Sequence, residues 1–259
     1  MARIRAPESL NLTWLTLLLA VVGGFVDAVG FLVLFNLFTA HMSGNSVAMT
    51  VHAGEGNWAA ALYRGFPIPL FLAGVVVGAL LSEAMFRRGM RSTFAPVLAL
   101  EAFLLLLFMS FDSAVRSGSG WAFYFVAALP PLTMGVQNSA LCRIGGMGVR
   151  TTFITGMLTN AGMEFAEYVY WLRDHFRRGR LGVLLLLSPR QQAFRRTILY
   201  FAVWMTYVAG GFTGTLAELR WGLLSLLAPV IALIGVAVRD LIHPIAPPKP
   251  PRDKPEWKV

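Results

Sequence analysis

Phe38-Thr39-Ala40-His41-Met42-Ser43-Gly44-Asn45 is a polar, glycine-containing stretch that follows one of the longest apolar runs in the chain. A second stretch, Arg150-Thr151-Thr152-Phe153-Ile154-Thr155-Gly156-Met157, repeats its pattern. In both, a Thr is followed four residues later by Ser or Thr and then by Gly. We interpret the two stretches as copies of one element. We expect each to form a re-entrant or broken helix, and the two to enter a membrane from opposite sides.

The composition places the chain in a membrane. Of its 259 residues, 56% are hydrophobic and only 14% are charged, and the mean hydropathy is +0.64. A soluble domain carries about 25% charged residues. Several apolar runs approach the roughly 20 residues that a helix needs to cross a bilayer, and they are continuous rather than alternating, unlike barrel strands. The sequence therefore predicts an all-α polytopic membrane protein.

Six apolar stretches are the predicted spans, and the first is long enough to tilt or to break at Gly23-Gly24 and Asp27. A further segment, 46–53, is too short to cross and fits a re-entrant or interfacial segment better. The spans are 12–38, 67–86, 94–111, 121–140, 197–216 and 221–241. The regions are a cytoplasmic lead (1–11), a first transmembrane repeat (12–111), an external linker (112–120), a second transmembrane repeat (121–242) with a cytoplasmic basic loop (173–196), and a disordered cytoplasmic tail rich in Pro and Lys (243–259).

The basic residues indicate the orientation of the chain. With a cytoplasmic N-terminus, all of the 22 lysines and arginines except Arg64, Arg116 and Arg220 fall on the cytoplasmic side. This bias is strong support for six spans with both termini in the cytoplasm. It also accounts for the net charge of +9, so no nucleic-acid partner is expected.

The two halves of the chain match beyond the polar stretches. Because each half has three spans, an odd number, the second copy must have the opposite orientation to the first. Inverted repeats with interrupted helices near the bilayer midplane are a recurring plan of secondary transporters. The matches are Gly24 and Asp27 with Gly135 and Asn138, Ala73-Gly74-x-x-x-Gly78 with Ala209-Gly210-x-x-x-Gly214, and Ala95-Pro96 with Ala228-Pro229.

The polar stretches could bind a solute. Ser or Thr at a break can cap a short helix and leave its first N–H groups free, and these groups favour an anion or a carbonyl oxygen. Alternatively, the Ser-Gly and Thr-Gly pairs only allow helices to pack closely. The candidate substrate-binding residues are Asp27, Thr39, Ser43, Gly44, Asn45, Gln137, Asn138, Thr151, Thr152, Thr155 and Gly156.

Two acidic residues inside predicted spans are candidates for coupling to a proton or a cation. A charge at this depth is costly, so Asp27 is expected to be functional, to cap a helix or to pair with an arginine. Its counterpart Asn138, with Gln137, would supply neutral ligands. Glu101 lies near the centre of the third span, and its counterpart is Ile234. Proton coupling and a buried structural hydrogen bond are equally good explanations for Glu101.

Four segments in this order resemble the bacterial YoaK family (DUF1275), a group of small membrane proteins of unknown function. They are Gly24-Phe25-Val26-Asp27-Ala28, the stretch 38–45, Met134-Gly135-Val136-Gln137-Asn138 and the stretch 151–156. The resemblance covers about residues 12–242. It implies a bacterial inner-membrane protein of about six spans, and it implies no substrate. His41-Met42-Ser43 departs from the aromatic or apolar residue followed by Thr-Gly-Asn that is usual in the family, so no special role is expected for His41.

The function that these features favour is a small secondary transporter or permease for a small anion or polar metabolite, coupled through Asp27 and Glu101. Two alternatives are a channel-like pore and a non-transporting scaffold that binds anionic lipid or a partner through the basic loop. No motif indicates an enzyme. Cys142 is the only cysteine and the histidines are scattered, so neither a metal nor a cofactor is expected. Besides the bilayer and the solute, a second copy of the chain is a candidate partner.

Overall fold

The computed structural model describes residues 6–90, 92, 94–118, 120–141, 152–177 and 188–245. Within them the regular structure is helical and no strand occurs, which confirms the predicted all-α fold. The first half contains α1 (Ala6–Val33), α2 (Met42–Gly54), α3 (Trp58–Gly65), α4 (Pro67–Arg87), α5 (Ala95–Ser110) and α6 (Asp112–Ser117). The second half contains α7 (Gly120–Ala127), α8 (Leu129–Leu141), α9 (Ile154–Arg177), η1 (Ser188–Arg190), α11 (Gln192–Trp221), η2 (Gly222–Leu226) and α12 (Leu227–Ile242).

Three stretches of the described chain are long and apolar enough to cross a membrane. They are Leu12–Val33, Trp58–Arg87 and Gln192–Ile242, and α5 is a shorter apolar helix. The last stretch contains both α11 and α12. α11 ends at Trp221, and the next residue, Gly222, has a φ of +61°. These helices support a membrane protein, while the count of six spans stays a prediction.

The first helix is continuous where the sequence suggested a break. α1 runs through Gly23, Gly24 and Asp27 to Val33. The chain reverses after it, at Phe35 and Asn36, which have φ values of +50° and +62°. The glycines of α1 therefore serve close packing instead of a kink.

Two pairs of helices pack at unusually short distances. A Cβ on Gly24 of α1 would lie 2.0 Å from the carbonyl oxygen of Tyr207 in α11. A Cβ on Gly74 of α4 would lie 2.1 Å from the carbonyl oxygen of Leu132 in α8. Only glycine allows two backbones to approach this closely. The pairs α1–α11 and α4–α8 are therefore fixed by small residues.

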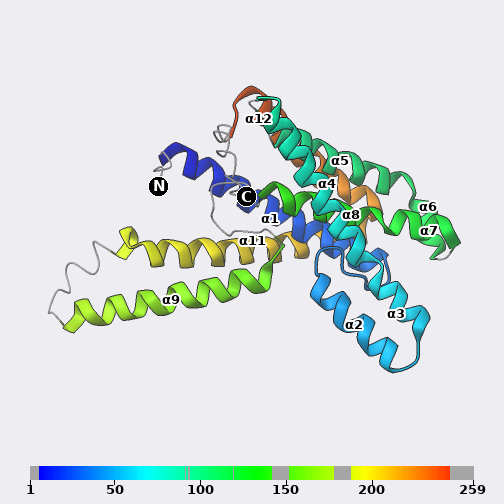
Figure 1. Cartoon of the computed structure of the whole chain (residues 1–259), viewed down its shortest axis with the longest axis horizontal. Coiled ribbons are helices and arrows are strands. Elements are labelled where there is room, and N and C mark those ends of the chain that lie inside the picture. The colour runs from blue at the N-terminus through cyan, green and yellow to red at the C-terminus, as the bar shows by residue number, and fades with distance from the viewer. Residues whose placement is uncertain are drawn as a thin grey trace, which may run out of the picture.

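The hydrophobic core lies where α1, α5, α8 and α12 meet, and two helical hairpins extend away from it. Fully buried side chains of the core include Leu19 of α1, Leu105 of α5, Met134 of α8 and Leu233 of α12. One hairpin consists of α2 and α3, and the other of α9 and α11, which run side by side (Figure 1). The polar stretches 38–45 and 152–156 lie where the chain leaves the core for these hairpins.

The helices reach further into the connections than their composition suggested. α9 continues to Arg177 and α11 begins at Gln192, so both enter the predicted basic loop 173–196. Residues 178–187 of this loop lie outside the described residues. The linker 112–120 contains the short helix α6.

Candidate functional site

The carboxylate of Asp27 joins α1 to the first polar stretch. Its Oδ1 accepts hydrogen bonds from the backbone N–H of Thr39 at 2.8 Å, the hydroxyl of Thr39 at 2.6 Å and the backbone N–H of Ala40 at 2.9 Å. Asp27 is only 5% exposed and Thr39 is fully buried. Because buried polar groups need partners, this network fixes the stretch to the side of α1.

The other oxygen of the same carboxylate contacts two ring side chains. Nδ1 of His41 lies 2.5 Å from Asp27 Oδ2, and the Tyr207 hydroxyl donates to the same oxygen at 2.7 Å. The rings of His41 and Tyr207 meet edge to face, with centroids 5.7 Å apart. The His41 side chain is 29% exposed and that of Asp27 is 7% exposed. Asp27 thus receives up to five hydrogen bonds, and His41 would balance its charge when the ring is protonated.

Asn45 holds the first polar stretch together from within. Its side-chain Nδ2 donates to the Phe38 carbonyl at 2.7 Å, and its Oδ1 accepts from the Phe38 N–H at 3.3 Å. Asn45 is fully buried. Both ends of the amide are therefore engaged within the stretch, which makes Asn45 an anchor of the loop.

The second polar stretch reaches α1 one helical turn from Asp27. Asn138 Nδ2 donates to the Thr152 hydroxyl at 2.5 Å, and Gln137 Nε2 donates to the Leu19 carbonyl at 2.7 Å. A Cβ on Gly23 would lie 3.0 Å from Thr152 Cγ2 and 3.4 Å from Gln137 Oε1. The structure therefore brings both polar stretches to adjacent turns of α1. Thr151 lies outside the described residues.

The Ser and Thr of the repeated pattern do not cap their helices. α2 begins at Met42 with His41 as its N-cap residue, and no side chain caps it. Ser43 is therefore the second residue of α2, and Thr155 is the second residue of α9. Both residues are exposed. The predicted cap is wrong because each helix begins two residues earlier than a cap at Ser43 or Thr155 requires. Before α2, the N–H groups of Thr39 and Ala40 are bound by Asp27.

The glycines of the pattern have a packing role. A Cβ on Gly44 would lie 3.1 Å from the ring of Phe38. A Cβ on Gly156 would lie 1.9 Å from the ring of Phe153. Both glycines thus give room to an aromatic ring that precedes the helix.

Glu101 lies apart from this network. It is fully buried on α5, and neither carboxylate oxygen has a hydrogen-bond partner among the described residues. The only other such buried side-chain atom in the described chain is Gln137 Oε1. These unpaired acceptors are unusual, because buried polar groups are almost always satisfied.

Two residues with prominent contacts were not predicted from the sequence. Tyr207 lies three residues before Gly210 of the repeated glycine pattern, which is the signal that could have placed it next to α1. Asp240 is 1% exposed. Its Oδ2 accepts from the Ser92 hydroxyl at 2.5 Å and the backbone N–H groups of Phe94 and Ala95 at 3.2 and 3.1 Å, and so caps α5.

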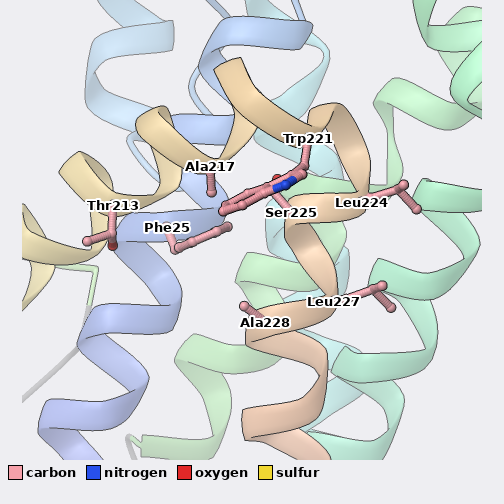
Figure 2. A pocket seen from close by; sticks show the side chains of 8 residues that line it. All are labelled: Phe25, Thr213, Ala217, Trp221, Leu224, Ser225, Leu227 and Ala228. Carbon is pink, nitrogen blue, oxygen red and sulfur yellow. The ribbon is translucent and has the colours of Figure 1, made fainter.

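A surface groove of about 530 Å³ lies beside α11, η2 and α12 (Figure 2). Its lining is almost entirely apolar, and neither Asp27 nor the second polar stretch contributes to it. It does not suit a polar solute. The lining residues are Phe25, Thr213, Ala217, Trp221, Leu224, Ser225, Leu227 and Ala228. Within the described residues, no group of three or more His, Cys, Asp and Glu side chains could hold a metal ion.

Comparisons with known proteins assign a family without an activity. Residues 15–239 match the sequence model of the family described as "Protein of unknown function (DUF1275)". The chain is 25% identical over 221 residues to the UPF0700 transmembrane protein YoaK of Bacillus subtilis (strain 168), which covers 85% of this chain and 89% of that protein. No solved structure matches.

Proposed function

The chain belongs to the DUF1275 family, and from that premise we propose that it is a small secondary transporter of the bacterial inner membrane for a small polar solute. Two inverted three-span repeats would form it, with both termini in the cytoplasm. The solute would bind where the two polar stretches approach α1 near Gly23 and Asp27. Coupling would be to a proton or a cation, with Asp27 and Glu101 as the candidate groups.

The packing of the glycines supports the repeat. Gly24 and Gly135 are matched positions, and each faces a matched carbonyl oxygen, that of Tyr207 for Gly24 and that of Phe71 for Gly135. In return, Gly210 faces the carbonyl of Val21 and Gly74 that of Leu132, again at matched positions and both at 2.1 Å. α1 of the first half thus packs on α11 of the second half, and α8 of the second half packs on α4 of the first half. Such a crossed exchange is expected of two related units around a pseudo-twofold axis.

One asymmetry between the halves carries the proposal. Asp27 is surrounded by His41 and Tyr207. The matched positions around the other helix crossing, where α8 meets α4, are Asn138, Phe153 and Phe71. A fold that forms with Asn138 and two phenylalanines around one of these crossings does not need an ion pair around the other. A buried Asp27 paired with a partly exposed His41 in a membrane domain is better explained by function, since such groups are costly there.

The same contacts narrow the solute class. The N–H groups of Thr39 and Ala40, which would have favoured an anion, are bound by Asp27. A free anion would face the negative charge of this carboxylate. A neutral or zwitterionic polar solute fits the mixture of Asp27, Thr152 and Gln137 Oε1 better.

Swelling of proteoliposomes tests this function without a prior choice of solute. Purified protein is reconstituted, and a panel of small anions, amino acids, polyols and sugars is added while light scattering is recorded. We expect saturable entry of a narrow class of solutes. The D27N variant should lose it, whereas T50A, which alters an exposed intrahelical hydroxyl of α2, should retain it.

The rival functions give different results in the same assay. Non-saturable entry of every solute below a size limit would indicate a channel-like pore. Entry of no solute, together with retained binding of the protein to anionic vesicles through the basic loop, would favour the scaffold.

A further inference from the structure

Glu101 is the one carboxyl side chain of the described residues that is fully buried and has no partner at either oxygen. Its neighbours on the buried face of α5 are apolar and include Leu98, Ala102 and Leu105. An ionised carboxylate in such a place would be uncompensated, which proteins avoid by neutralising the group. A neutral carboxyl with its proton in place is therefore the form that this environment accepts.

The helices around α5 offer no charge to Glu101. α5 packs against α8, α12, α4 and η2, and α8 and η2 carry no charged or titratable side chain. The charged residues of the other two helices are engaged at the end of the bundle where α5 begins. Arg87 pairs with Glu83 at 3.0 Å, Arg239 lies over the Trp14 ring, and Asp240 caps α5. Glu101 is about 9 Å further along α5, six residues after Ala95.

The repeat gives no structural reason for an acid at this position. The matched residue of α12 is Ile234, and the two helices share the Ala-Pro start that aligns them. Asp27, by contrast, is saturated with donors and holds a loop in place. Of the two acidic residues, only Glu101 is free to change its protonation state without dismantling a hydrogen-bond network.

We propose that Glu101 is the proton-binding group of the transport cycle, an inference that rests on the proposed transporter function. While Glu101 is buried as in this structure, its carboxyl group keeps the O–H bond. When α5 is exposed to water, that bond breaks, the electron pair stays on the carboxylate, and the proton passes to water as hydronium. On the other side of the membrane the carboxylate takes a proton from hydronium and the site closes again. Asp27 is then a positioning residue, and the coupling ion is the proton.

Infrared difference spectroscopy of the protein in lipid nanodiscs tests the protonation directly. At neutral pH we expect the C=O stretching band of a protonated carboxylic acid, shifted when the glutamates carry ¹³C at the side-chain carboxyl. E101Q should lack the band, and E83Q, which removes a partly exposed carboxylate of α4, should keep it. If E101Q does not fold, E101D replaces it, and the band should then no longer respond to ¹³C-glutamate. Identical spectra for the wild type and E101Q would overturn the inference.

Accessibility of the site tests the coupling. A single cysteine at position 43, in a chain with C142S, is labelled with an impermeant maleimide at increasing pH. E101Q imitates the protonated state. At alkaline pH, the labelling rate of its cysteine should therefore stay several-fold below the rate in the protein that keeps Glu101. Equal pH dependence in both proteins would overturn the coupling role, and because both carry the same thiol, its own ionisation cancels.

The two measurements separate the two proposals. If the infrared band is missing, Glu101 is not the proton site, but the protein can still be a transporter with a different coupling group. If the infrared band is present but position 43 never reacts from any side, the transporter itself fails, and the role of Glu101 in transport fails with it.

Discussion

The Tyr207 hydroxyl lies 2.7 Å from Oδ2 of Asp27, 180 residues earlier in the chain. This contact joins α1 to α11 beside the place where Gly24 meets the Tyr207 carbonyl. The same carboxylate also binds the backbone of the first polar stretch. One side chain therefore ties together two helices and a loop.

Substitutions at Asp27 and Tyr207 should differ in their effect on stability. D27A leaves two buried N–H groups and the Tyr207 hydroxyl unpaired, and should cost about 3–5 kcal/mol. Y207F removes one donor of several and should cost about 1–3 kcal/mol. D27N keeps an oxygen that can accept from Thr39 and Ala40, and the matched residue of the second half is itself an asparagine, so the variant should fold while transport is lost. Thermal unfolding in detergent measures all three, and a D27A protein as stable as the wild type would contradict the role of the carboxylate.

The glycines at the helix crossings should tolerate no side chain. G24A places a methyl group 2.0 Å from a backbone oxygen, which must move for the helices to pair. We expect loss of the folded protein, measured as the monodisperse fraction on size-exclusion chromatography. G235A is the matched control in α12, where a Cβ would meet nothing within 4 Å. It should be neutral or stabilising by about 0.5–1 kcal/mol. Equal yields for G24A and G235A would show that the close α1–α11 packing is absent.

Much of this fold was accessible from the sequence, because hydropathy and glycine spacing act locally. The Gly74 and Gly210 patterns identified the helix faces that pack closely. Of the two alternatives for the first span, a tilt or a break, the break does not occur. A glycine pair in a helix can serve packing as well as bending. Which of these roles such a pair has depends on what faces it, and Gly24 faces Tyr207 of α11, which comes 183 residues later in the chain.

The candidate site was predictable only in part. Asp27 stood out because an acid in an apolar run is rare. The importance of His41 comes from contacts that sequence spacing does not show. Its ring lies against the carboxylate of Asp27, fourteen residues earlier, and against the ring of Tyr207 in α11. Asp240 was not singled out, because only the folded chain brings it to the start of α5.

Asn45 should control the shape of the first polar stretch. N45A removes both hydrogen bonds to Phe38 and leaves a partly buried carbonyl and N–H without these partners, at a cost of about 1–3 kcal/mol. The loop should loosen, so a cysteine at position 43 should react faster. S46A is the matched control, because its hydroxyl bonds only within α2. Unchanged labelling rates in N45A would mean that the loop is held by other contacts.

Asp240 should hold the start of α5 through its capping bonds. D240A removes the acceptor of Ser92, Phe94 and Ala95 and should lower the thermal midpoint markedly, whereas S92A removes one donor and should lower it slightly. Hydrogen exchange of the first turn of α5 reports the loss locally. If exchange there is unchanged in D240A, the cap does not form in the membrane.

Sidedness of the two polar stretches tests the central claim most directly. In a C142S chain, one cysteine is placed at Ser43 or at Thr155, both of which are exposed. An impermeant maleimide is then applied to right-side-out and inside-out vesicles. Two inverted repeats predict that position 43 reacts only from outside and position 155 only from inside. Reaction of both positions from the same side would contradict the inverted arrangement and remove the main support for a transporter.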